Sequence, residues 1–232
     1  MLDGIPVFNE QCSIGGISLF VYDRTFIVAS ARPLSVISSA VLGADLRQVR
    51  YIINHSVDKD YHSSDPEEDL RQLALCLHLG KDVLGMMSAV SVKNTVLCQE
   101  RQKDLTVAAL CTAGTGNPGV AGLPVGKVQS QYKPGTINLI LLVDGNMTDA
   151  AMVNAVITAT EAKARALFKA KVTLPDGEPV TGTTTDSIVV AGTGRGEPLR
   201  YAGTATGLGY LIGSTVYRAV AQGVKNYARG ML

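Results

Sequence analysis

A short hydroxyl-rich segment carries the residues of this sequence that are best suited to chemistry. Residues 181–187 read TGTTTDS and lead directly into the apolar run IVVA. Hydroxyl groups beside a carboxylate can hold a substrate amide or activate a nucleophile. A plain hydroxyl-rich turn is the competing interpretation. On the chemical interpretation, Asp186 is a candidate catalytic residue, and Thr183 and Thr185 are candidate substrate-binding residues.

Two further catalytic candidates lie in other polar groups. His55 follows an apolar run and Asn54, and an imidazole can transfer a proton near neutral pH. Glu161 lies on a predicted helix among Thr and Ala residues rather than among charges. This setting favours a partly buried carboxylate that could act as a general base, against the alternative of a solvated helix face. We expect Asp186 or Glu161 to be the base, and His55 to be the acid or an orienting group.

Small and amide side chains near the ends of apolar runs complete the candidate binding residues. Residues 112–119 read TAGTGNPG, and backbone N–H groups around Gly114 could face a developing oxyanion. Thr136 and Asn138 share one face of a predicted strand. A flexible turn and a cross-strand pair are the simpler alternatives for these two groups. The full set of binding candidates is Asn54, Thr112, Gly114, Asn117, Thr136, Asn138, Thr183 and Thr185.

Several common catalytic and cofactor motifs are missing from the sequence. There is no P-loop, Gly-x-Ser-x-Gly elbow or His-Glu-x-x-His. The three histidines are not spaced as a metal pair, and the four cysteines form no Cys-x-x-Cys. We therefore expect no metal site and no bound cofactor. Cys76 and Cys111 lie in apolar runs, where free cysteine behaves as a small hydrophobe, and this usage favours a reducing cytoplasm.

Composition and charge argue against several kinds of partner. The 232 residues include 21 Lys and Arg against 20 Asp and Glu, which gives a net charge of +1. That balance argues against a broad basic surface for nucleic acid. The most apolar stretch, residues 137–143, is far shorter than the roughly 20 residues of a membrane span. We expect neither a nucleic-acid nor a membrane partner, and the oligomeric state, a homo-oligomer included, stays open.

Strands and helices alternate along the chain and must position these groups. Asp65 and Pro66 are typical of a helix start, and that helix should run toward Gly80. Thr148 should cap a helix over 149–169, and a closing helix over 206–227 contains Gly209 and Gly213, which allow close packing. The expected strands are two within 18–30 around a turn at Asp23, then 34–42, 50–53, 83–92, 104–112, 136–143 and 187–191.

This alternation predicts the fold class. Short apolar strands followed by amphipathic helices favour an α/β or α+β protein. We expect one domain over residues 1–232, built as a layered sandwich in which helices cover a mixed β-sheet.

At its polar groups the chain resembles the adenosylcobinamide amidohydrolase (CbiZ) family. The resemblance covers roughly residues 20–225, and its segments follow the order of the family. One departure is Thr184, where the family usually has Gly, so a role for Thr184 itself is not expected. The matching segments are 54–66, 84–87, 112–114 with 117, 136–138, 148–151, 159–163, 181–183 with 185–187, and 201–204.

The resemblance implies hydrolysis of one amide on a corrinoid side chain, with a small-molecule cobalt corrinoid as the substrate. Adenosylcobinamide would give adenosylcobyric acid and aminopropanol, as part of corrinoid (vitamin B12) salvage. A second mechanism makes a threonine hydroxyl the nucleophile, with or without self-cleavage of the chain. A non-enzymatic alternative is a protein that binds or sequesters the corrinoid on the same scaffold, with apolar walls and scattered amide-binding groups.

Overall fold

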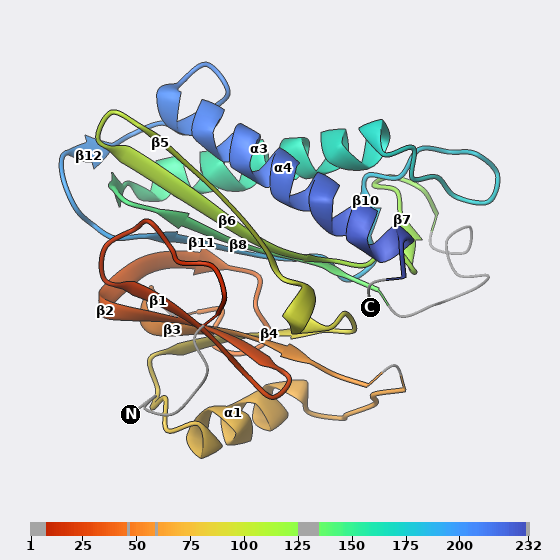
Figure 1. Cartoon of the computed structure of the whole chain (residues 1–232), viewed down its shortest axis with the longest axis horizontal. Coiled ribbons are helices and arrows are strands. Elements are labelled where there is room, and N and C mark those ends of the chain that lie inside the picture. The colour runs from red at the N-terminus through yellow and green to blue at the C-terminus, as the bar shows by residue number, and fades with distance from the viewer. Residues whose placement is uncertain (1–7, 46, 59, 125–134, 231–232) are drawn as a thin grey trace.

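The computed structural model describes residues 8–45, 47–58, 60–124 and 135–230, and Figure 1 shows their arrangement. The long elements, in chain order, are β1 (Ile17–Tyr22), β2 (Thr25–Ser38), β3 (Gln48–Ser56), α1 (Pro66–Cys76), β4 (Val83–Ser88), β5 (Val96–Gln102), β6 (Leu105–Ala113), β8 (Ile137–Val143), α3 (Asp149–Lys169), β11 (Ser187–Gly192) and α4 (Gly207–Ala228). Shorter ones are a 3-10 turn at Val92–Asn94, β7 (Pro118–Gly119), β9 (Asn146–Met147), β10 (Gly182–Thr183) and β12 (Pro198–Leu199).

The long strands form one mixed sheet. Its order is β4-β3-β2-β11-β8-β6-β5, and β1 pairs with β2 beside this path. The pairs β3–β4 and β8–β11 are parallel, whereas the other pairs of this sheet are antiparallel. The predicted mixed sheet covered by helices is therefore confirmed.

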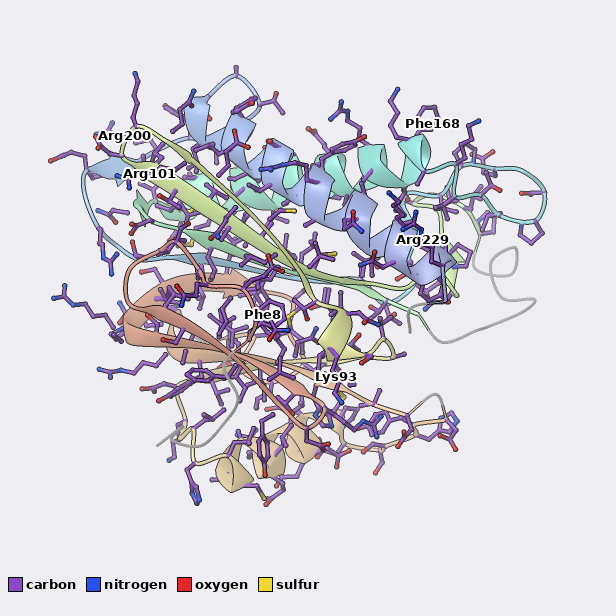
Figure 2. All side chains as sticks on the ribbon, in the orientation of Figure 1. Phe8, Lys93, Arg101, Phe168, Arg200 and Arg229 are labelled. Atoms are coloured by element: carbon purple, nitrogen blue, oxygen red, sulfur yellow. The ribbon has the colours of Figure 1, made fainter. Side chains whose placement is uncertain are left out.

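The long strand β2 lets the sheet fold back over itself. Its register with β3 shifts between Ala29 and Leu34, and its last residues pair with β11 instead. The half of the sheet formed by β1 to β4 then faces the half formed by β5, β6, β8 and β11 (Figure 1). A buried apolar cluster fills the space between the halves, with Ile52, Met86 and Leu110 among its members. Phe8, labelled in Figure 2, joins it by packing edge-on against Phe26, with 5.1 Å between the ring centroids.

Helices cover the two outer faces of the folded sheet. α3 and α4 lie on the half that contains β6 and β8, and α1 lies under the other half (Figure 1). Alanines along α3 pack against the sheet, which brings the helix axis close to the strands. Phe168, near the end of α3, points away from the body into solvent (Figure 2). Within the described part of the chain, none of the helices combines the length and apolar character needed to cross a bilayer.

The predicted helix starts agree with the structure. The Asp65 carboxylate accepts a hydrogen bond from the Glu68 backbone N–H at 3.0 Å, and the Thr148 hydroxyl accepts one from the Ala151 N–H at 3.2 Å. α3 spans the predicted residues, but α1 ends at Cys76 rather than near Gly80. The chain already turns at His78, whose φ is 54°. Cys76 is exposed, so only Cys111 is the buried small hydrophobe that the sequence predicts.

Close helix packing depends on glycines that the sequence identifies only in part. A Cβ on Gly209 would overlap the backbone of Gly203, so this glycine is required. Gly213 has no such contact, because its nearest neighbour would lie 3.9 Å away. The glycine that brings α4 onto β6 is Gly223, whose added Cβ would lie 2.9 Å from the Ala113 Cβ. Strand β5, which α4 also covers, was not predicted because its residues alternate polar and apolar only weakly.

Candidate active site

A buried polar network joins the two halves of the sheet at one end. Asn54 on β3 donates to the Thr112 hydroxyl on β6 at 3.1 Å. Asn138 on β8 donates from its amide nitrogen to the Asn54 side-chain oxygen at 2.9 Å and to the Met87 carbonyl at 2.7 Å. Asn54, Thr112 and Asn138 are each at most 3% exposed. Such amides are stable inside a protein only when their donors and acceptors are matched.

The same network extends to the hydroxyl-rich segment. The Thr136 hydroxyl donates to the Thr185 carbonyl at 2.8 Å and lies 3.3 Å from the Asn138 side-chain oxygen. The Thr185 hydroxyl in turn donates to the Gly135 carbonyl at 3.1 Å. Thr136 and Asn138 therefore do share one face, as predicted from strand alternation. The position of residues 183–186 is thus tied to a core that spans both halves of the sheet.

Asp186 lies immediately before β11 and points to the helix side of the sheet. Its carboxylate accepts from the Lys163 ammonium on α3, from the Thr183 hydroxyl, and from the backbone N–H groups of Ile137 and Thr183, both at 3.1 Å. The Lys163 and Asp186 side chains are only 12% and 16% exposed. Charge-assisted hydrogen bonds of this kind are strong and orient the carboxylate firmly.

This group forms part of the wall of a cavity of about 560 Å³ between α3 and the short β7–β10 pair. Small-molecule sites commonly have volumes of about 300–1,000 Å³. The cavity combines apolar and hydroxyl groups with one ion pair, and apolar walls with a few placed polar groups are typical of small-molecule sites. Its lining residues are Gly119, Val120, Ala121, Leu123, Thr160, Lys163, Ala164, Thr181, Gly182, Thr183, Thr184 and Asp186.

Asn117 and Gly114 lie behind this wall. The Asn117 amide nitrogen donates to the hydroxyls of Thr184 at 2.9 Å and Thr185 at 3.3 Å. Its side-chain oxygen is buried and has no hydrogen-bond partner among the described residues. The Gly114 N–H donates to the Thr136 carbonyl at 2.9 Å, so this amide is engaged within the protein and does not serve the predicted oxyanion contact as it stands.

His55 does not line the cavity that contains Asp186. Successive residues of a strand face opposite sides, so Asn54 points between the sheet halves and His55 points outward. His55 lines a separate cavity of about 240 Å³ with Arg24, Asp58 and Tyr61. Its Nδ1 lies 2.9 Å from the Thr25 hydroxyl. Burial, and then the Arg24 charge, lower the pKa of His55, so the neutral imidazole is favoured.

Glu161 also lies outside the cavity that contains Asp186. It is exposed on α3, so the partial burial expected from its Thr and Ala neighbours is not found. Ala159 and Ala162 are buried against the sheet, whereas Thr160 and Glu161 are exposed, because residues one apart on a helix are separated by about 100°. The structure therefore brings together Asp186 with the hydroxyl and amide candidates, but neither His55 nor Glu161.

Lys163 is the residue of this site that sequence reasoning missed. In the sequence it lies between two alanines, Ala162 and Ala164, on a helix whose buried alanines pack against the sheet. A lysine at such a position is seldom buried without a partner. That mismatch between charge and helix face is the signal that would have identified it. Within the described residues, no three His, Cys, Asp or Glu side chains converge as metal ligands.

A family model and two curated relatives indicate one family. Residues 13–231 match the family model CbiZ, described as adenosylcobinamide amidohydrolase. The chain is 28% identical over 214 residues to an adenosylcobinamide amidohydrolase of Methanosarcina mazei. This alignment covers 88% of this chain and 96% of the relative. It is 38% identical over 118 residues to an adenosylcobinamide amidohydrolase of Halobacterium salinarum, covering 49% and 48%. A Burkholderia beta-aminopeptidase structure aligns with a TM-score of 0.41 at 13% identity, over 95% of this chain and 83% of that one.

Proposed function

Because this chain belongs to the adenosylcobinamide amidohydrolase family, we propose that it hydrolyses one amide bond of adenosylcobinamide. Water is consumed, the C–N bond of the aminopropanol amide breaks, and adenosylcobyric acid and aminopropanol are released. The cobalt corrinoid is the substrate, and the protein needs no cofactor of its own for this step. The reaction would return incomplete corrinoids to a form that can be rebuilt, which is a salvage role.

The observation that carries this proposal is the Lys163–Asp186–Thr183 group in the cavity wall. An amide is a poor electrophile, so its hydrolysis requires a positioned nucleophile, a proton acceptor and a charge that stabilises the oxyanion. Asp186 supplies the acceptor, Lys163 supplies the positive charge, and the hydroxyl of Thr183 is held against the carboxylate. These three functions meet within hydrogen-bond contact of one another, which is the arrangement that acyl transfer requires.

The buried network is the support for this group. Asn138, Asn54 and Thr136 connect β3, β6 and β8 to the backbone at Thr185, one residue before Asp186. A catalytic group must be held within a fraction of an ångström to be effective. We therefore assign the predicted binding candidates Asn54, Thr112, Thr136 and Asn138 a supporting role behind the cavity rather than direct substrate contact.

The test is to incubate the purified chain with adenosylcobinamide and to measure released aminopropanol and the new corrinoid carboxylate. We expect both products in equal amounts, and a loss of at least a hundredfold in rate for Asp186→Asn. Asp104→Asn, at an exposed aspartate of the β5–β6 turn, is the matched control and should keep the wild-type rate. Binding of the corrinoid with no release of aminopropanol would instead establish the non-catalytic binding protein.

A further inference from the structure

The hydroxyl groups of the segment 181–185 have different partners. The Thr181 hydroxyl accepts from the Ala121 backbone N–H at 2.9 Å, and the Thr184 hydroxyl accepts from the Asn117 amide. The Thr185 hydroxyl donates to the Gly135 carbonyl at 3.1 Å. Within the described chain, only the Thr183 hydroxyl among these four donates to a carboxylate. A hydroxyl becomes a nucleophile when an adjacent base can accept its proton.

The contact between Thr183 and Asp186 is fixed from several directions. Thr183 binds the carboxylate twice, because its hydroxyl donates to Oδ1 and its backbone N–H donates to Oδ2. The Ile137 N–H on β8 and the Lys163 ammonium on α3 hold the same two oxygens. Both Thr183 and Lys163 line the cavity of about 560 Å³. The hydroxyl oxygen is therefore positioned at the place where a ligand would lie.

Resting on the proposed function, we infer that Thr183 is the nucleophile and that the reaction passes through an ester between its hydroxyl oxygen and the corrinoid acyl group. The Thr183 oxygen forms a bond to the amide carbon, its proton passes to Asp186, and the carbonyl electron pair moves to the oxygen. The oxyanion electron pair then re-forms the carbonyl as the C–N bond breaks, and the amine nitrogen takes the proton from Asp186 and leaves as aminopropanol.

Water completes the cycle. It attacks the ester carbon and gives a proton to Asp186, and the carbonyl then re-forms as the bond to the Thr183 oxygen breaks. That oxygen takes the proton back from Asp186, and adenosylcobyric acid is released. In both stages of the reaction, ester formation and ester hydrolysis, the negative charge moves from the Asp186 carboxylate to the oxyanion, and Lys163 remains beside both groups. The Lys163 ammonium therefore faces a negative group both before and after the proton transfer, first the carboxylate and then the oxyanion. Because the Lys163 side chain is mostly buried, its attraction to that negative charge is stronger than it would be in water.

A trapping experiment distinguishes this route from direct attack by water. Two reactions of the wild-type protein are run in the presence of hydroxylamine. One contains adenosylcobinamide, and the other contains an analogue whose aminopropanol is replaced by ethanolamine. A shared ester intermediate predicts the same ratio of hydroxamate to acid from both substrates. A ratio that changes with the leaving amine would overturn the inference, because the amine would then still be present when the acceptor attacks.

Substitution provides the second measurement. We expect Thr183→Ala to lower the rate at least a hundredfold, while Thr183→Ser retains turnover and gives a hydroxamate ratio that is again the same for both amides. More than one hundredth of the wild-type rate in Thr183→Ala would reject Thr183 as the nucleophile and leave the proposed function standing. No aminopropanol release by the wild type would reject the proposed function itself. If Thr183→Ala fails to fold, the wild-type ratio decides alone.

Discussion

Lys163 and Asp186, which lie 23 residues apart in the chain, form an ion pair that bridges helix α3 and the start of strand β11. Both side chains are mostly buried, at 12% and 16% exposure. Removing one partner of such a pair leaves the other charge desolvated and unpaired, which is the most unfavourable arrangement. The pair therefore contributes to stability in a way that a double-mutant cycle can isolate.

We expect Lys163→Met to lower the free energy of unfolding by about 3 kcal/mol, and Asp186→Leu to lower it by a similar amount. The double variant should lose clearly less than the sum of the two, since no unpaired charge remains. Urea unfolding of the wild type and the three variants provides the measurement. Additive losses would mean that the two charges do not interact in the folded protein.

Gly182 is the residue that makes room for this ion pair. A Cβ there would lie 2.8 Å from the Lys163 ammonium and still closer to the Asp186 carboxylate. Gly182→Ala should separate the pair and reduce the rate of amide hydrolysis at least tenfold, or about 1.4 kcal/mol in activation free energy. Gly203→Ala is the control, because its Cβ would meet no atom within 4 Å. Equal rates for the two variants would contradict this role of Gly182.

Asn138 supplies both donors at the centre of the buried network. Asn138→Ala would leave the Asn54 side-chain oxygen and the Met87 carbonyl without these hydrogen bonds. Each unsatisfied buried acceptor costs about 1–3 kcal/mol, so we expect a loss of about 3 kcal/mol in urea unfolding. Asn226→Ala, which removes only an exposed hydrogen bond to Gln222, should stay within about 0.5 kcal/mol of the wild type. Similar losses in both variants would argue against the network.

His55 should make the protein less stable in mild acid. Burial and the Arg24 charge lower its pKa, while Asp23 and Asp58 act in the opposite direction. Because the folded-state pKa lies below the unfolded value of about 6.5, the unfolded chain binds the proton first as the pH falls. The free energy of unfolding is therefore unaffected by His55 titration above about pH 6.5, and it decreases as the pH falls from there toward the folded-state pKa of His55.

Thermal melting between about pH 7 and pH 5 measures this effect. His55→Gln, which keeps a side chain able to hydrogen-bond with the Thr25 hydroxyl, should show a shallower fall in melting temperature than the wild type over that range. His62→Gln, at an exposed histidine, should reproduce the wild-type slope. A His55→Gln curve parallel to that of the wild type would show that His55 keeps its ordinary pKa.

The cysteines should react with thiol reagents in the order of their exposure. Cys76 is exposed, whereas Cys111 is buried and its pKa is raised by burial. Burial also raises the pKa of Cys12 and Cys98. Since the thiolate is the reactive form, Ellman's reagent should modify Cys76 first and Cys111 only after unfolding. Loss of the fast phase in Cys76→Ser would confirm this order, and its persistence would contradict it.

Local chemistry was enough to identify the helices and most of the sheet. The starts of α1 and α3 follow from Asp65 and Thr148, whose oxygens accept backbone N–H groups within a few residues, so no distant contact is needed. The buried strand β8 follows from a run of apolar residues that only Asn138 interrupts. The predicted end of α1 near Gly80 is wrong. The chain leaves the helix earlier, because His78 already adopts a positive φ.

The sequence by itself determined which residue types are available for chemistry, that is, the hydroxyls and carboxylate of residues 181–187 and the buried amides and hydroxyls near the strand ends. Tertiary structure alone decided which of them meet. The fold of β2 brings Asn54 onto Asn138, whereas strand alternation turns the adjacent His55 to another cavity. Pairing Lys163 with Asp186 requires α3 to pack across β11, and such a contact depends on the position of whole elements rather than on any spacing along the chain.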